Sequence, residues 1–399
     1  MRRTALILIA LFCCLAASAQ ELPSCARADR AVLKYPGSRA RMERFRERLQ
    51  ACAESPDSSV TIWHIGGSHV QAGFLPSRLR HNFDSLGHYP AGGRGYIFPY
   101  PLAGTNYDRS YNVGSTGEWA GARSTLPLKN VPLQPAWGIL GIAAYTADTT
   151  ASFGIGTPER FRRLHIMAEA SEGVTPLVVA GADTLRCAPD SLLRGFVVDF
   201  PAEVDSVLIL PSLRSGDYFM LTGLLPLIPD EKGVHFVSTG VNGARTDTWF
   251  KRCSEFEREA SLLKPDLLIL GLGINDSACP ASQFKPEKFK ANYRKLLEIM
   301  MKDAPDCAIV FITNNDSWRY AKRHRMVHNE NGAAVERAMY ELAAEYDAAV
   351  WDLFELMGGN HSAPTWRDAG LMKNDRLHFT AAGYRLLGDM LYRAIVDGE

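Results

Sequence analysis

The stretch that decides the fold reads TIWHIGGSHV and spans residues 61–70. It is a short apolar run that stops at two glycines and then offers a serine hydroxyl. An apolar run of this length bounded by glycine predicts a buried β-strand that ends in a tight turn. Residues 71–83 have apolar side chains at roughly helical spacing, so Ser68 is expected between a strand end and a helix start. In open α/β sheets, ligands bind at that position.

A serine at this position has two interpretations. As a functional residue, Ser68 can use the helix N-terminus and nearby backbone N–H groups to bind an oxyanion. As a structural residue, it only caps the helix, which is a common role of serine. Taken alone, the stretch favours the capping role, and residues elsewhere in the chain are needed to distinguish the two interpretations.

The N-terminus has the pattern of a secretory signal peptide. Arg2 and Arg3 precede an apolar run over residues 5–17, and the small residues Ala-Ser-Ala follow at 17–19. The apolar run is too short for an ordinary membrane span, and no second long apolar segment follows it. We therefore expect cleavage after Ala19 and an exported protein, periplasmic or secreted, without a stable membrane span.

Composition limits the partners and the cysteine chemistry of the mature chain. The 399 residues contain 44 Lys+Arg and 44 Asp+Glu, so no global basic field attracts nucleic acid or anionic lipid. Two of the eight cysteines lie in the leader, and the spacing of the others matches no zinc pattern. Because exported proteins can form disulfides, Cys25 and Cys52 are the pair to test, with scattered buried thiols as the alternative.

Two kinds of sequence pattern alternate along the chain. Strand and helix patterns fill residues 26–97 and 231–399, where aliphatic runs such as Asp266–Leu272 are typical of central parallel strands. Residues 98–230 carry short β-like runs separated by turn residues, which favours a β-sandwich. The sequence thus predicts a doubly wound, parallel-sheet α/β domain split by an inserted β-sandwich domain. Helices are expected over 37–52, 71–83, 247–263, 286–302, 330–346 and 380–396, and strands of the insertion over 137–145, 163–168, 176–180, 195–200 and 206–210.

Small, polar, turn-rich groups follow the predicted strands of the α/β domain, and one more precedes the last helix. These groups are Gly66–His69, Gly240–Thr246, Gly271–Asp276, Asn314–Asp316 and Asn374–Thr380. The carboxyl ends of parallel strands meet at one rim of a sheet, so the five groups should gather there. Five such groups in consistent order are hard to obtain by accident, and they favour a functional role for Ser68.

Nucleophilic acyl transfer needs a hydroxyl, a base, a group that orients the base, and donors for the oxyanion. Ser68 supplies the hydroxyl, His378 is the best base, and Asp375 is placed to fix the tautomer of its imidazole. Gly243 offers an unobstructed backbone N–H, and Asn275 offers a side-chain amide.

Each of these residues has a simpler alternative. Asp375 and His378 could be polar residues before a helix, and Asn275 an ordinary turn residue. His64 and His69 are alternative bases, but His64 lies inside the predicted strand and is expected to be packed. His69 is expected at the helix start, where it is a candidate for substrate binding. Asn315, in the fourth polar group, is a second such candidate.

The polar groups resemble the sequence blocks of the SGNH (GDSL-type) hydrolase superfamily. The resemblance lies in Gly66–His69, Gly240–Thr246, Gly273–Asp276 and Asp375–His378. It implies that Ser68 is the nucleophile, His378 the general base and Asp375 its partner. It also implies an oxyanion hole made by the N–H groups of Ser68 and Gly243 and the side chain of Asn275, and no metal or organic cofactor.

The position of the insertion is similar to that in exported peptidoglycan O-acetylesterases. In those enzymes a domain like a carbohydrate-binding module splits the SGNH domain, and this part of the resemblance rests on architecture rather than on a motif. One residue departs from the pattern, because the family usually carries aspartate where this chain has Gly67. That aspartate is outside the catalytic set, but its loss puts the turn and full activity in doubt.

These observations lead to one hypothesis and two alternatives. The hypothesis is an exported serine esterase that removes O-acyl groups, expected to be O-acetyl, from peptidoglycan or another glycan through an acyl-enzyme on Ser68. The first alternative is a hydrolase of lipid or small-molecule esters. The second is a weak or inactive hydrolase that binds glycan.

Overall fold

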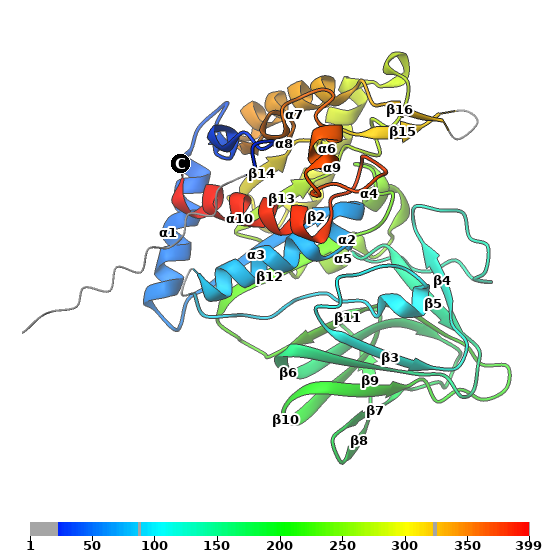
Figure 1. Ribbon diagram of the computed structural model, residues 1–399. Coiled ribbons are helices and arrows are strands. Elements are labelled where there is room, and N and C mark those ends of the chain that lie inside the picture. The colour runs from blue at the N-terminus through cyan, green and yellow to red at the C-terminus, as the bar shows by residue number, and fades with distance from the viewer. Residues whose placement is uncertain (1–22, 87–88, 322–324, 399) are drawn as a thin grey trace, which may run out of the picture.

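A computed structural model describes residues 23–86, 89–321 and 325–398. The predicted leader, residues 1–19, lies outside these described residues, so it stays a prediction. Figure 1 shows a layered α/β part at the top and a β-rich part, built by the middle of the chain, below it. Within the described ranges, no helix has the length and apolar character needed to cross a membrane.

A six-stranded sheet, in the order β1-β17-β14-β13-β2-β12, forms the centre of the α/β part. The parallel strands are β2 (Ser59–Gly66), β12 (Gly233–Gly240), β13 (Leu267–Gly271), β14 (Ala308–Ile312) and β17 (Ala349–Trp351), and β1 (Leu33–Lys34) joins the edge antiparallel. Among the parallel strands, β2 comes first along the chain, β12 is added on one side of it, and β13, β14 and β17 follow on the other. The strand order therefore reverses between β2 and β13, where ligands bind in doubly wound sheets. The predicted α/β fold is confirmed.

Helices cover both faces of this sheet (Figure 1). The long ones are α1 (Ala40–Glu54), α3 (Phe74–Ser85), α6 (Pro286–Met300), α7 (Gly332–Tyr346) and α10 (Ala381–Asp397). The short ones are α2 (Ser68–Gln71), α4 (Thr248–Arg252), α5 (Phe256–Ser261), α8 (Leu353–Met357) and α9 (Ala363–Asp368), with 3-10 turns at Ala28–Arg30, Tyr100–Ala103 and Ala281–Gln283. Neighbouring residues of β2 point to opposite faces: Ile62 packs with α1, α3 and α10, and Trp63 packs with α5.

Two of the predicted helices are broken in the structure. The helix expected over 71–83 is split into α2 and α3 at Gly73, whose φ of +83° ends the first segment. The helix expected over 247–263 is split into α4 and α5 at Cys253, whose backbone is extended. Apolar spacing continues through both breaks, so periodicity alone did not reveal them.

The middle of the chain forms a nine-stranded antiparallel sheet. Its strands are β3 (Asn112–Thr116), β4 (Ala120–Arg123), β5 (Ile142–Thr146), β6 (Ser152–Ala170), β7 (Leu177–Ala180), β8 (Asp183–Arg186), β9 (Ala188–Asp190), β10 (Gly195–Leu210) and β11 (Phe219–Leu227). The runs 195–200 and 206–210, expected as separate strands, both belong to β10. The residues between them, PAEVD at 201–205, are mostly exposed and include a proline and two acidic residues, and the register against β6 shifts there. A separate hairpin, β15 (Trp318–Tyr320) and β16 (Met326–His328), lies in the α/β part.

The cysteines that the structure describes are unpaired. All six described cysteines are free, including Cys25 and Cys52. Cys52 is buried on α1, where its thiol lies 3.6 Å from the carbonyl oxygen of Ser58. The disulfide suggested by the sequence is therefore wrong, and the alternative of scattered thiols holds. Burial raises the pKa of Cys187, Cys253 and Cys307 to about 12, so these thiols stay protonated.

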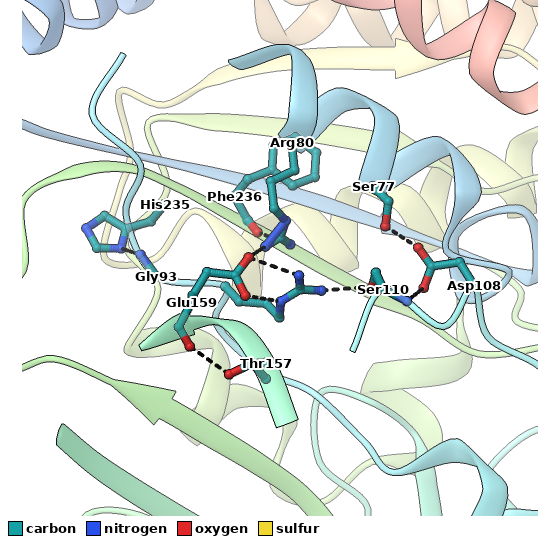
Figure 2. Close-up of polar contacts among 10 residues, drawn as sticks. Ser77, Arg80, Gly93, Asp108, Ser110, Thr157, Glu159, His235 and Phe236 are labelled. Carbon is teal, nitrogen blue, oxygen red and sulfur yellow. Dashed lines mark hydrogen bonds and ion pairs between the residues drawn. The ribbon is translucent and has the colours of Figure 1, made fainter. Parts of the chain in front are cut away.

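Buried ion pairs connect the two parts of the chain (Figure 2). Glu159 on β6 accepts two hydrogen bonds from Arg94, at 2.8 and 2.9 Å. Arg80 on α3 lies 3.7 Å from the same carboxylate and donates to the backbone carbonyl of Phe236 on β12 at 2.6 Å. Burial alone would raise the pKa of Glu159, but the Arg94 guanidinium and the nearby Arg80 lower it. The carboxylate is therefore charged and joins the β-rich part to the parallel sheet.

We expect Glu159→Gln to destabilise the protein by about 3–5 kcal/mol, because two buried guanidinium groups lose their counter-charge. Asp199→Asn is the matched control. Asp199 also accepts two hydrogen bonds from an arginine, Arg163, but this pair is exposed, so the loss should stay below about 1 kcal/mol. Denaturant unfolding measures both variants. Equal losses would contradict the role assigned to Glu159.

Candidate active site

Ser68 lies where the sequence predicts it: β2 ends at Gly66, and Ser68 is the first residue of α2. The turn needs glycine at Gly66, because a Cβ there would collide with the side chain of Val70 and lie 3.0 Å from the carbonyl oxygen of Gly271. The close approach of β2, α2 and β13 therefore depends on the absence of a side chain. It leaves the serine hydroxyl at the rim of the sheet, next to the point where the strand order reverses.

The Ser68 hydroxyl is hydrogen-bonded to an imidazole that is in turn held by a carboxylate. Ser68 Oγ lies 2.8 Å from His378 Nε2, and His378 Nδ1 lies 2.8 Å from Asp375 Oδ2. Asp375 Oδ1 accepts the backbone N–H groups of Leu377 and His378, both at 3.0 Å. Burial opposes the charge of Asp375, but these hydrogen bonds from His378 and Leu377 lower its pKa to about 2. An ionised carboxylate favours a proton on Nδ1 and leaves Nε2 free to accept the serine proton.

Residues that follow β14 support the loop that carries His378. Asn315 is 2% exposed, and its amide donates to the carbonyl oxygens of Asp316 and Leu377. The backbone N–H of Trp318 donates to the carbonyl of Arg376, and the Arg376 guanidinium lies 4.4 Å from the Trp318 ring centre. The expectation that Asn315 contacts substrate is therefore corrected: it is buried behind the loop.

Three N–H donors border the hollow beside Ser68. The Asn275 amide donates one hydrogen to the carbonyl of Ala244 at 2.9 Å and has a second hydrogen to offer. Within the described part of the chain, the backbone N–H groups of Ser68 and Gly243 make no hydrogen bond. Gly243 has φ of +86°, a conformation that favours glycine. Ser68, Gly243, Asn275 and His378 line one hollow, so the arrangement can hold an oxyanion next to a hydroxyl nucleophile.

The two histidines considered as alternative bases, His64 and His69, make no hydrogen bond to the Ser68 hydroxyl among the described residues. His64 is fully buried in β2, as expected, and burial lowers its pKa to about 3. His69 Nδ1 lies 2.8 Å from the Tyr384 hydroxyl, and its ring centre is 5.3 Å from that of His378. Burial and the neighbouring His378 imidazole lower the pKa of His69 to about 3, so this ring is neutral. His69 therefore packs beside the reactive imidazole without adding a charge.

Glycine at position 67 leaves the reactive groups in hydrogen-bonding positions. A Cβ at Gly67 would lie 3.3 Å from Asn275 Nδ2 and 3.7 Å from the Ala244 carbonyl oxygen. A side chain there would thus contact the Asn275 amide. With glycine, that amide is oriented by its hydrogen bond to the Ala244 carbonyl.

Several residues of the hollow were not identified from the sequence. They are Ala72, Asn106, Asn242, Lys373, Leu377 and Tyr384. Asn242 and Leu377 lie within polar groups that the sequence singled out, and Lys373 is close to one of them. No local pattern marks Asn106, which comes from the segment before β3.

Comparisons with known proteins found one matching family model and several solved structures of similar fold. Residues 215–386 match the model of the GDSL-like lipase/acylhydrolase family. A solved peptidoglycan O-acetylesterase is similar over 92% of this chain and 98% of its own, with a TM-score of 0.70 and 19% identity. An acetyl xylan esterase (TM-score 0.33, 17% identity) covers 40% of this chain and 81% of its own. The acetylxylan esterase of Geobacillus stearothermophilus (TM-score 0.30, 18% identity) covers 42% and 74%. No curated protein matches significantly.

Proposed function

We propose that this chain is an SGNH (GDSL-type) hydrolase and, more specifically, an exported serine esterase that removes O-acetyl groups from peptidoglycan or another glycan. The observation that carries the proposal is the continuous hydrogen bonding from Ser68 through His378 to Asp375, beside three oxyanion donors. The similarity in fold to a peptidoglycan O-acetylesterase over nearly the whole chain supports the substrate class. Export rests on the predicted leader at residues 1–19.

In the proposed mechanism, Ser68 is the nucleophile and His378 the general base. His378 Nε2 takes the hydroxyl proton while Ser68 Oγ forms a bond to the ester carbonyl carbon. The N–H groups of Ser68 and Gly243 and the amide of Asn275 bind the oxygen that becomes negative. The tetrahedral adduct then expels the sugar oxygen, which receives the proton from His378. An acetyl group remains on Ser68.

The second half of the reaction uses the same groups. His378 accepts a proton from water, whose oxygen attacks the acetyl carbonyl carbon. Collapse of the second tetrahedral adduct breaks the bond to Ser68 Oγ, which takes the proton back, and acetate leaves. Asp375 holds the ring and stabilises the imidazolium in both halves. Its low pKa keeps it ionised throughout.

The polarity of the hollow favours a glycan over a long-chain lipid. Asn106, Asn242 and Lys373 provide amide and ammonium groups beside Ser68, suited to sugar hydroxyls and carbonyls. We assign residues 26–97 and 231–399 to the hydrolase domain and residues 98–230 to an inserted domain, with a carbohydrate-binding role for the insertion.

Acetate release tests this proposal. The wild type should release acetate from O-acetylated peptidoglycan, and Ser68→Ala should release none above background. Acetylated xylan is the comparison substrate. Faster release from xylan would indicate that the substrate is another glycan rather than peptidoglycan, and release from neither substrate would contradict the proposed esterase activity. N-terminal sequencing of exported protein tests the leader, since the proposal expects Gln20 as the first residue.

A further inference from the structure

The peptide unit between Asn242 and Gly243 is held by a residue of the β-rich insertion. Its N–H belongs to Gly243 and borders the hollow beside Ser68. Its carbonyl belongs to Asn242 and accepts a hydrogen bond from Thr125 Oγ1 at 2.7 Å. The peptide unit is planar, and in the trans form its carbonyl and N–H point in opposite directions. A contact that fixes the carbonyl therefore also fixes the direction of the N–H.

The loop around Gly243 needs such a restraint. Gly243 has φ of +86°, and glycine reaches many backbone conformations at little cost. Thr125 follows β4, in a segment where the Ser124 N–H bonds to the carbonyl of Gly141. A Cβ at Gly243 would lie 3.5 Å from Thr125 Oγ1, so the insertion is in direct contact with the glycine. The restraint thus acts on the most adaptable residue of the loop.

A second set of contacts holds the other side of Asn242. Its N–H donates at 2.7 Å to the side chain of Gln71, on the helix that Ser68 begins. Gln71 is 3% exposed, and its amide donates to Thr105 Oγ1 and the Asn106 carbonyl, both at 3.1 Å. The Asn242 side chain donates to Asn106 Oδ1 at 2.9 Å. The nucleophile helix, the Gly243 loop and the inserted segment are therefore joined by one polar network.

We propose that Thr125 is a positioning residue, through which the inserted β-domain keeps the Gly243 N–H directed at the oxyanion of the reaction. The proposal rests on the esterase function proposed above. The hydrogen bond to the Asn242 carbonyl also polarises the peptide unit and strengthens its N–H as a donor. The ion pairs of Glu159 with Arg94 and Arg80 hold the insertion against the hydrolase sheet, which makes Thr125 a fixed support (Figure 2). The insertion is therefore part of the catalytic apparatus, beyond any role in binding glycan.

Three variants of the full-length protein test the role of Thr125. Thr125→Val removes the hydroxyl and keeps the branched shape, and Thr125→Ser keeps the hydroxyl. Thr157→Val is the matched control, because Thr157 Oγ1 also donates to a backbone carbonyl at 2.7 Å, that of Glu159 within β6. The substrate is p-nitrophenyl acetate, which is too small to report on glycan binding. Thermal unfolding and circular dichroism verify that each variant is folded.

Loss of one oxyanion donor lowers kcat by about 10²–10³-fold, and Thr125 acts on such a donor indirectly. We expect Thr125→Val to lower kcat by about 10–100-fold with KM changed less than about threefold. Thr125→Ser should restore most of the loss, and Thr157→Val should match the wild type. Thr125 is half-buried, so its variants should fold, and Thr125→Ala serves as a second hydroxyl-free variant with the same expected result.

Several results would overturn the inference. A kcat for Thr125→Val equal to that of an active wild type would do so, as would a loss that Thr125→Ser does not restore. A change confined to KM would mean that Thr125 acts in binding, which also contradicts the proposal. A wild type without Ser68-dependent turnover is a different failure, because it would remove the proposed function and the inference together.

Discussion

Replacing Ser68 with alanine should lower kcat for ester hydrolysis by at least about 10⁴-fold, with the fold intact. The variant loses the proposed nucleophile, while the proposed oxyanion donors at Gly243 and Asn275 and the proposed base, His378, remain. These groups can still bind an ester, but the acyl-enzyme cannot form. Initial rates on p-nitrophenyl acetate and acetate release from O-acetylated peptidoglycan measure the loss.

A second serine–histidine contact in the same chain supplies the control. Ser85 Oγ lies 3.3 Å from His81 Nδ1 on the exposed end of α3. Ser85→Ala should therefore leave kcat unchanged. If Ser68→Ala kept activity within tenfold of the wild type, another nucleophile would be responsible and the assignment would be wrong.

Asp375→Asn should lower kcat by about 10³–10⁴-fold and leave KM nearly unchanged. The asparagine oxygen can still accept the backbone N–H groups of Leu377 and His378, so the loop should keep its shape. Its amide would then face His378 Nδ1 and favour the tautomer with the proton on Nε2. That nitrogen could no longer accept the proton of Ser68. Steady-state kinetics of the variant test this expectation.

The chain offers a close geometric match as a control for Asp375. Asp190 Oδ2 lies 2.5 Å from His165 Nδ1, and its Oδ1 accepts the backbone N–H groups of Leu192 and Leu193. This pair lies in the β-rich insertion. Asp190→Asn should leave kcat unchanged at a temperature where the variant is folded. A similar fall in kcat for Asp190→Asn and Asp375→Asn would indicate a general effect on the fold.

The low pKa of Asp375 adds a pH dependence to the same comparison. Its folded-state pKa of about 2 lies below the unfolded value of about 3.9. The carboxylate therefore contributes stability above the unfolded pKa, and the contribution is lost as pH falls through the folded one. The difference in Tm between the wild type and Asp375→Asn should therefore shrink as pH falls from about 4 towards the folded-state pKa of about 2. A difference that stays constant as pH falls below about 4 would contradict an ionised Asp375.

The sequence predicts the α/β fold and also predicts that Ser68, Asp375 and His378 lie close together. Both predictions are possible because they depend on local sequence patterns. Aliphatic runs mark the parallel strands, and polar groups at strand ends meet wherever a parallel sheet forms. The helix breaks at Gly73 and Cys253 left no such signal, since the apolar spacing continues through them. The sequence divides β10 in two for the opposite reason, because the middle of the strand, PAEVD at 201–205, is mostly exposed and interrupts the apolar run.

Other features depend on contacts between distant segments, which no local pattern carries. Asn315 was expected at the substrate because it follows a strand, yet its amide is used by the carbonyl of Leu377. Thr125 and Asn106 reach the site from the insertion through hydrogen bonds to Asn242. These contacts form only when the nine-stranded sheet packs against the α/β part of the chain.

Covalent labelling tests the central claim, that Ser68 is a nucleophile activated by His378, most directly. The wild type, Ser68→Ala, Ser85→Ala and His378→Ala are treated with a fluorophosphonate, and the modified peptide is identified by mass spectrometry. We expect a single phosphonyl group on Ser68 in the wild type and in Ser85→Ala. Labelling should be absent in Ser68→Ala and strongly slowed in His378→Ala. Labelling of another residue, or ester turnover that persists in Ser68→Ala, would contradict the account.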